Sequence, residues 1–348
     1  MRIIVATAQA LFIKGGAEYH AQNLVSALVR AGHDVELINI PLIDDPIELL
    51  ENQIVVARLL ELERSWAGNT DLFIGLKFPA YYAKHSNKVV WLLHQHRILY
   101  DLWETQFSGA HLQPQGERIR NIVHNADNLY LREAKKIHTN SKNVSNRLKT
   151  YNSIDSTPLY HPCPDMEKFY CESYDDYILM PSRIGSTKRQ ELAIEAMMHT
   201  KSNIKLYVVG KAANEYDHNY LLQFIKDRKM EDRVIYYDYV SQEEKFKLYA
   251  NARAVLFIPY DEDYGYITLE AMSASKPIIT TTDSGGPLEF VESGKTGLIS
   301  KPNPSDIARA IDEIAENETF AKKMGAAAKK HITDMNITWD NVVRELTK

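Results

Sequence analysis

Residues 254–281 read AVLFIPYDEDYGYITLEAMSASKPIITT. An apolar run (254–259) is followed by a polar loop around Gly265, by a helix-forming segment that starts near Tyr266, and by a β-branched run at 277–281. Short apolar or β-branched runs bounded by turn residues are typical of buried strands. The stretch therefore predicts a strand–loop–helix–strand unit, the repeating part of a parallel sheet covered by helices.

The same alternation continues on the N-terminal side of this unit. Further runs of strand composition lie at 3–7, 35–40, 71–76, 88–93, 136–141, 177–182, 204–210 and 233–240. The segment HPCPD (161–165) interrupts the pattern with two prolines, and we place a domain boundary there. The predicted fold is α/β, with two doubly wound, Rossmann-like domains that face a cleft: an N-terminal domain at 1–165 and a C-terminal domain at 166–334.

Composition limits the classes of function. The 348 residues are 45% hydrophobic and 25% charged, which is typical of a globular protein. The net charge of −5 argues against a nucleic-acid partner. Two cysteines, Cys163 and Cys171, are too few for a zinc site or a disulfide framework, so we expect a reducing cytoplasm. No apolar run approaches the roughly 20 residues that span a bilayer.

Two loops in the first half follow predicted strands and carry polar groups. KGGAE (14–18) places Gly15 and Gly16 at the start of a helix, where a backbone can approach an anion closely. The loop lacks the GxGxxG spacing of nicotinamide enzymes, and an ordinary tight turn is the alternative. HQHR (94–97) places His94 at a strand's carboxyl end, where it can exchange protons or merely bond the backbone.

Two loops in the second half have complementary charges. SRIGSTK (182–188) offers Arg183 and Lys188, which have the chemistry to clamp phosphates, although many surface loops carry such residues. In DEDYGYITLE (261–270), Glu262 lies in the loop and Glu270 about one turn inside the predicted helix. Ionised carboxylates repel a diphosphate and accept well from hydroxyls, so the pair of loops suits a sugar nucleotide.

One further segment is strongly basic. Residues 132–149 read REAKKIHTNSKNVSNRLK. Such a segment can contact an anionic membrane surface, which would make the protein a peripheral membrane partner. A solvated helix face is the reading that we favour.

Taken together, these motifs resemble retaining glycosyltransferases of family four. The pair Glu262 and Glu270, with seven residues between them, is similar to the E-x7-E signature of that family. KGGAE resembles its N-terminal glycine loop, and SRIGSTK its phosphate-binding pair. LYVVGKA, SQEEKFKLYANA, EAMSASKPIIT, SGGPLEFV and GKTGLIS follow in the family's order. The resemblance is dense over the last half of the chain and thinner before it.

The resemblance implies the two-domain GT-B fold and a set of site residues. The closing helix, around Trp339 within 335–348, is expected to cross back to the N-terminal, acceptor-binding domain. Glu270 would hold the ribose hydroxyls, Glu262 the transferred sugar, and Arg183 and Lys188 the diphosphate. His94, Glu262, Arg183 and Lys188 are the candidate catalytic residues. The other implied donor-binding residues are Gly15, Gly16, Gly210, Tyr264, Gly265, Tyr266, Ile267 and Glu270.

The resemblance also implies a reaction. A hexosyltransferase would move a sugar from a UDP-, GDP- or dTDP-linked donor to a carbohydrate or a lipid-linked saccharide, in polysaccharide or glycoconjugate assembly. The anomeric configuration would be retained by front-face attack, with no metal and no cofactor beyond the co-substrate. The expected location is the cytoplasm, including the inner face of the membrane.

Three residues depart from the resembled family, and two other functions fit less well. Arg189, Asp263 and Ser275 stand where that family usually has glycine.

Asp261 and Asp263 form a DxD pattern typical of metal-dependent glycosyltransferases of another fold; we interpret it as coincidental because its surroundings differ. A sugar-nucleotide 2-epimerase would be expected to show additional acids and a different signature. A catalytically silent binder would be expected to lack some of the residues that are all present here.

Overall fold

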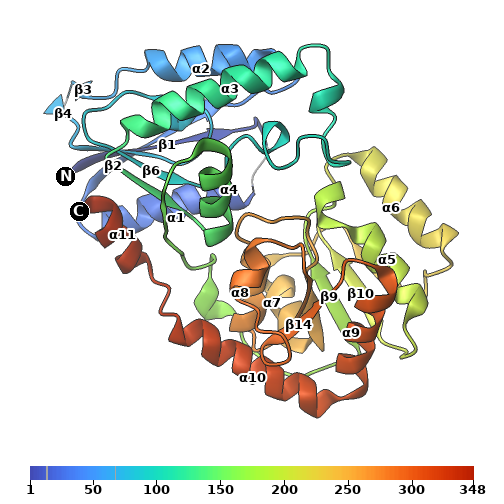
Figure 1. Cartoon of the computed structure of the whole chain (residues 1–348). Helices are drawn as coiled ribbons and strands as arrows, with labels where there is room; N and C mark the ends of the chain where they lie inside the picture. The colour runs from blue at the N-terminus through green and yellow to red at the C-terminus, as the bar shows by residue number, and fades with distance from the viewer. Residues whose placement is uncertain (13–14, 67) are drawn as a thin grey trace. The chain divides into compact units, whose positions relative to one another are not determined.

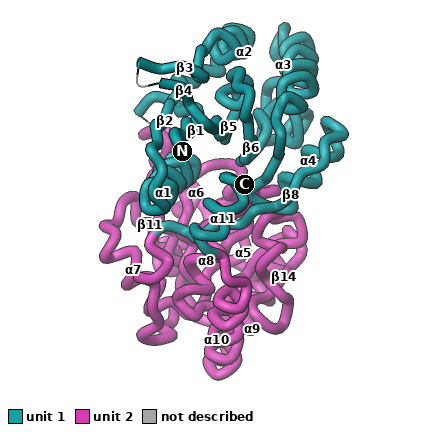
Figure 2. Tube along the Cα trace, turned by 90° about the vertical axis from the view of Figure 1, so that its left-hand side faces the viewer, with its two compact units in different colours: residues 1–164, 338–348 teal, residues 165–337 magenta. Residues whose placement is uncertain are grey.

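The computed structural model describes residues 1–12, 15–66 and 68–348 (Figure 1). The chain divides into two compact units (Figure 2). Unit 1 comprises Met1–Pro164 and the closing segment Thr338–Lys348, and unit 2 comprises Asp165–Ile337. Each unit contains one parallel six-stranded sheet with helices packed on it. The predicted fold class, α/β with two doubly wound domains, is confirmed in this respect.

The sheet of unit 1 has the strand order β2-β1-β5-β6-β7-β8, with all neighbours parallel. The central strands β5 and β6 are apolar apart from Lys88 and fully buried, as strands covered on both faces are. A short antiparallel ribbon, β3 (Arg64–Ser65) with β4 (Gly68–Asn69), lies outside this sheet. The six strands are β1 (Arg2–Gln9), β2 (Asp34–Pro41), β5 (Leu72–Gly75), β6 (Lys88–Leu92), β7 (Lys136–Thr139) and β8 (Thr157–Pro158).

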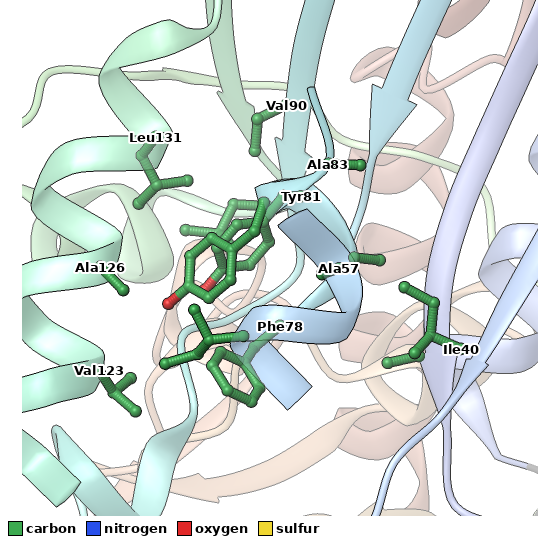
Figure 3. Close-up of a cluster of buried hydrophobic side chains, with 14 of the residues drawn as sticks. Ile40, Ala57, Phe78, Tyr81, Ala83, Val90, Val123, Ala126 and Leu131 are labelled. Carbon is green, nitrogen blue, oxygen red and sulfur yellow. The ribbon is translucent and has the colours of Figure 1, made fainter. Parts of the chain in front are cut away.

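Two hydrophobic clusters cover the two faces of this sheet. Because strand side chains alternate, Ile4 packs with α2 and α3 on one face, and Ile3 packs with α1 and α11 on the other. Figure 3 shows part of the first cluster, where the ring of Tyr81 lies among apolar side chains that include Val123 of α3. The helices of unit 1 are α1 (Gly16–Arg30), α2 (Leu49–Leu59), α3 (Gly116–Tyr130), α4 (Lys142–Asn152) and α11 (Trp339–Thr347).

The sheet of unit 2 has the order β11-β10-β9-β12-β13-β14, again with all neighbours parallel. Its strands are β9 (Tyr177–Pro181), β10 (Lys205–Val209), β11 (Val234–Tyr237), β12 (Ala254–Leu256), β13 (Ile278–Thr281) and β14 (Gly297–Ser300). Its helices are α5 (Gln190–His199), α6 (Glu215–Asp227), α7 (Gln242–Asn251), α8 (Tyr266–Ser273), α9 (Pro304–Glu316) and α10 (Glu318–Asp334).

The basic segment 132–149 is divided between two elements instead of forming one solvated helix. Residues Lys136–Thr139 form β7, and α4 begins only at Lys142. Arg147 is buried, and one of its guanidinium nitrogens lies 3.8 Å from an Asp101 carboxylate oxygen. The strand predicted at 136–141 is therefore confirmed, whereas the interpretation of the whole segment 132–149 as a solvated helix face is wrong. Among the described residues, no helix combines the length and the apolar character that crossing a membrane requires.

Candidate functional site

The strand order of unit 2 determines which loops meet. Successive strands run outward from β9 in one direction as β10 and β11, and in the other as β12, β13 and β14. The order therefore reverses between β9 and β12, and open parallel sheets bind ligands at the carboxyl ends of the strands beside such a reversal. The loop after β9 carries Arg183 and Lys188, and the loop after β12 carries Glu262 and Gly265. The topology thus brings together the two charged loops singled out in the sequence.

The loop after β9 is held in place by buried contacts. The Gln190 side-chain amide donates to the Ser182 hydroxyl at 2.9 Å and to the Arg183 carbonyl at 3.1 Å. Gly210, at the end of β10, permits a close approach, since a Cβ there would lie 2.0 Å from the Ser182 carbonyl oxygen. The Arg183 side chain is exposed and has no ion-pair partner in the part of the chain that the structure describes. Gly210 therefore positions the neighbouring loop.

Backbone and side-chain bonds join the two loops. The Tyr260 amide donates to the Thr187 carbonyl at 2.7 Å. The Arg189 guanidinium donates to the Pro259 carbonyl at 2.6 Å and to both carboxylate oxygens of Asp283 at 2.9 and 3.0 Å. A bidentate arginine–carboxylate pair has fixed geometry, so it holds the loops after β9, β12 and β13 together.

Lys188 and Glu262 form an ion pair across the two loops. Both side chains are about one-fifth exposed, at 22% and 19%. The Glu262 backbone is fixed on both sides, because its amide donates to the Ser284 carbonyl at 2.9 Å and its carbonyl accepts from the Gly286 amide at 2.7 Å. The sequence predicted both residues as site residues but did not predict that they are paired with each other.

The predicted start of the helix after β12 is correct, since α8 begins at Tyr266. Gly265 caps it with φ of 85°, a conformation that favours glycine, and a Cβ there would lie 2.8 Å from the Phe257 ring. Tyr264 is buried, and its ring makes an edge contact with that of Tyr266 at 5.9 Å between centroids. The first amides of α8, including that of Ile267, have no acceptor within the helix. This geometry offers N–H groups at the helix start.

Glu270 lies inside α8 and is 6% exposed. One of its carboxylate oxygens is 2.7 Å from Lys245 Nζ, and the other accepts from the Tyr249 hydroxyl at 2.6 Å. Lys245 and Tyr249 were not predicted as site residues from the sequence. Their spacing of four residues, on the same face of one helix, is the signal that pairs them. A carboxylate has about four lone-pair sites, so two donors leave Glu270 able to accept further hydrogen bonds.

The remaining predicted residues lie in unit 1. Lys14 of the KGGAE loop lies outside the described residues. The Gly15 amide donates to the Glu18 carboxylate at 2.7 Å, and Gly16 begins α1. His94 Nδ1 lies 2.5 Å from the Gln95 carbonyl oxygen, which only accepts, so Nδ1 carries the proton. In a neutral ring the acceptor nitrogen is then Nε2, which suits a role at a substrate oxygen.

The support for the His94 loop is buried and polar. The Gln95 side chain is buried and donates to the Asn152 side-chain oxygen at 3.0 Å. Burial, followed by the charges of His94 and Lys77, lowers the pKa of His96 to about 3, so this ring is neutral. Over the residues described, no three His, Cys, Asp or Glu side chains are grouped so as to hold a metal ion.

The comparisons with known proteins agree on one class. Residues 167–331 match the family model of glycosyl transferases group 1. The α-1,3/1,6-mannosyltransferase ALG2 of Dictyostelium discoideum is 31% identical over 211 residues, which is 56% of this chain and 47% of that protein. The chain thus spans about half the length of this relative. An uncharacterized glycosyltransferase of Methanocaldococcus jannaschii is 25% identical, covering 96% of this chain and 93% of that protein.

Solved structures resemble the whole chain. Sucrose-phosphate synthase from Thermosynechococcus elongatus aligns with a TM-score of 0.80 at 16% identity, covering 99% of this chain and 97% of that one. Anabaena HepE in complex with UDP and glucose aligns with a TM-score of 0.71 at 16% identity, covering 100% of this chain and 98% of that one. At this identity the likeness shows the fold alone, which is the GT-B fold of glycosyltransferases.

Proposed function

We propose that this protein is a retaining hexosyltransferase that transfers a sugar from a nucleoside-diphosphate sugar to a hydroxyl acceptor. The observation that carries the proposal is the switch point of unit 2, where the loop with Arg183 and Lys188 meets the loop with Glu262 and the start of α8, and Lys188 pairs with Glu262. Cations and helix N–H groups bind phosphates, whereas carboxylates accept from hydroxyls. The match of residues 167–331 to glycosyl transferases group 1 supports the same activity.

Each site residue has a proposed role. Arg183 and Lys188 hold the diphosphate, assisted by backbone amides at Gly265 and Tyr266. Glu270 accepts from the ribose hydroxyls, since Lys245 and Tyr249 already hold its carboxylate in position. Glu262 accepts from hydroxyls of the transferred sugar. For unit 1, we propose that the amides of Gly15 and Gly16 assist at the phosphates and that His94 acts at the sugar.

The proposed chemistry needs no dedicated base. The acceptor oxygen bonds to the anomeric carbon on the face from which the phosphate leaves, so the configuration is retained. The bond between the anomeric carbon and the phosphate oxygen breaks, and a phosphate oxygen takes the acceptor's proton. The residues of unit 2 contribute by neutralising the charge that develops on the leaving diphosphate, a large effect in enzymes. We propose that Arg183 and Lys188 supply this charge without a metal or other cofactor.

The two glutamates should behave differently when truncated. Glu270→Ala should weaken binding of the free nucleoside diphosphate by about 1.5–3 kcal/mol, because charge-assisted hydrogen bonds to ribose are lost. Glu262→Ala should bind the nucleotide at least as well as the wild type and should lose transfer. Calorimetric titration with UDP, GDP and dTDP measures the first effect, and a radiolabelled-sugar transfer assay measures the second.

A matched control is Glu313→Ala, which removes an exposed glutamate of α9 in the same unit. It should bind nucleotide as the wild type does. If Glu270→Ala also bound the nucleotide like the wild type, the assignment of Glu270 to the ribose would be wrong. Turnover separates an enzyme from a silent binder, and repeating the assay with EDTA tests the proposed independence from metals.

The acceptor and the location are part of the proposal. We propose a carbohydrate or lipid-linked saccharide acceptor bound by unit 1, in polysaccharide or glycoconjugate assembly on the cytoplasmic side of a membrane. The names of the relatives support a saccharide product, since ALG2 is a mannosyltransferase. Co-sedimentation with vesicles of anionic lipid, with and without salt, tests the membrane contact.

A further inference from the structure

The Lys188–Glu262 ion pair places an anion of the protein itself on the cation proposed to hold the donor's diphosphate. Resting on the function proposed above, we infer that Glu262 competes with the diphosphate for Lys188. It holds this cation in the empty site, releases it when the donor binds, and retakes it after transfer, which promotes release of the nucleoside diphosphate.

The two cations beside this site differ in how firmly they are held. The Arg189 guanidinium donates three hydrogen bonds, two to Asp283 and one to the Pro259 carbonyl, and its side chain is 11% exposed. Lys188 has a flexible four-carbon stem and is 22% exposed. Its backbone is anchored by a bond from its amide to the Gly185 carbonyl at 2.8 Å. Lys188 can therefore turn from Glu262 to a phosphate by side-chain rotation, whereas Arg189 stays in place.

Glu262 is also restricted to a side-chain movement. Its amide and carbonyl are both bonded to the 284–286 segment, so the loop does not need to move when the pair breaks. When Lys188 turns to a phosphate, the Glu262 carboxylate loses the favourable charge of this ion pair, and hydrogen-bond donors can replace part of it. The hydroxyls of the transferred sugar are such donors. A donor molecule therefore compensates for both ends of the broken ion pair, with its diphosphate on Lys188 and its sugar on Glu262.

The product does not compensate for both ends. After transfer, the nucleoside diphosphate still occupies Lys188, but Glu262 has lost its sugar partner. The ion pair can re-form only when the diphosphate leaves, so its re-formation favours release of the product. This asymmetry predicts that the intact donor binds more tightly than the nucleoside diphosphate, although Arg183 can contact the diphosphate of both.

The test is the isosteric variant Glu262→Gln, which keeps the side-chain shape and removes the competing charge. We expect it to bind UDP, GDP or dTDP, whichever the wild type binds, and inorganic pyrophosphate about three- to tenfold more tightly, where tenfold corresponds to about 1.4 kcal/mol. Product inhibition by the nucleoside diphosphate should increase by a similar factor. Since a damaged fold weakens binding, a gain in affinity cannot come from misfolding.

Two controls separate this competition from a general charge effect. Asp263→Asn removes the same charge one residue away and should change affinity less than twofold. In a Lys188→Met background, adding Glu262→Gln should produce no gain. Equal or weaker binding by Glu262→Gln, an equal gain in Asp263→Asn, or a full gain in the Lys188→Met background would each overturn the inference. If the wild type binds none of these nucleotides or pyrophosphate, the proposed function itself is wrong and the inference falls with it.

Discussion

At the scale of single residues, Ser275 shows how a helix end stores a small amount of strain. It follows α8 with φ of 56°, in the left-handed region. The Ser275 amide donates to the Met272 carbonyl at 3.0 Å, and the Lys276 amide donates to the Ala271 carbonyl at 2.9 Å. These two bonds define a Schellman motif, in which glycine is the preferred residue at the left-handed position. A serine there is strained by its Cβ.

Ser275→Gly should therefore stabilise unit 2. The expected gain in the free energy of unfolding is about 0.5–1 kcal/mol, because relief of the left-handed strain exceeds the extra entropy of glycine in the unfolded chain. Urea unfolding followed by circular dichroism measures it. Arg189→Gly is the informative contrast, since Arg189 has φ of 58° but also the bidentate bond to Asp283. That variant should lose stability; if both variants behaved alike, backbone strain would not be the deciding term.

These two positions also show what can be predicted for a residue. The resemblance indicated that glycine is usual at 189 and 275, and both positions have positive φ. The partner of Arg189 lies 94 residues away in the sequence, and that of Glu270 lies 21 or 25 residues away on another helix. Local patterns contain no information about such distant partners. Residue types at the site were therefore predictable, whereas the ion pairs among them were not.

At the scale of elements, the predictions succeeded where the sequence signal was long and apolar. The run 177–182 became β9, whose five residues are all buried, and the run 88–93 became β6. The four-residue edge strand β14 was missed, because only its first residue is buried and the others are partly exposed. The basic segment 132–149 was interpreted as a helix face, although 136–141 was also predicted as a strand; the structure has β7 at Lys136–Thr139 and α4 from Lys142. Charge does not distinguish a helix from a strand, whereas periodic burial does.

The closing helix α11 packs within unit 1 through its buried apolar residues and through the ring of its first residue, Trp339. The Trp339 ring lies 5.7 Å from that of His161, and 6.2 Å from those of His20 and Trp91, between centroids. Trp339→Ala should lower the free energy of unfolding of unit 1 by about 2–4 kcal/mol, because Trp339 is partly buried and large-to-small changes at aromatic contacts cost this much. Circular dichroism in urea measures the loss.

The matched control for that variant is Arg344→Ala on the same helix. The Arg344 side chain is 62% exposed, so the change should stay within about 0.5 kcal/mol. Trp339→Phe should recover part of the loss, since it restores an aromatic ring. A Trp339→Ala variant as stable as the wild type would show that the Trp339 ring contributes little to the stability of unit 1.

At the scale of the whole molecule, buried ionisable groups are unevenly distributed. Burial, followed by the charge of His161, lowers the pKa of His20 well below its usual value, and burial lowers those of His96 and His161 to about 3. All three belong to unit 1. In the same unit, burial raises the pKa of Asp127 to about 6, although three tyrosine hydroxyls donate to its carboxylate. Unit 1 therefore carries most of the expected pH dependence.

The direction in which pH changes the stability of unit 1 follows from the difference in proton binding between the folded and unfolded chain. His96 and His161 bind protons in the unfolded chain below about pH 6.5 and in the folded chain only near pH 3, so their stabilising contribution is complete above pH 6.5 and is lost as the pH falls. At pH 4.5 the contribution of each of these histidines to the free energy of unfolding is smaller by roughly 2–3 kcal/mol. Asp127 has the opposite effect, because its pKa is higher in the folded chain than in the unfolded chain. As the pH falls to 4.5, protonation of Asp127 adds roughly 2 kcal/mol to the free energy of unfolding. The net effect is a loss of stability in unit 1.

Acid should therefore unfold unit 1 before unit 2, and the tryptophans allow this to be observed. All four, Trp66, Trp91, Trp103 and Trp339, belong to unit 1, so tryptophan fluorescence reports on that unit alone. When the pH is lowered from 7.5 to 4.5, the urea midpoint measured by tryptophan fluorescence should decrease. It should decrease by more than the urea midpoint of the unfolding transition of unit 2, which is followed by circular dichroism. His161→Gln, which cannot take up a proton, should reduce the pH dependence, because only the wild-type ring gains a proton on unfolding. A fluorescence midpoint independent of pH in the wild type would contradict the assignment of the buried histidines as the acid-sensitive groups.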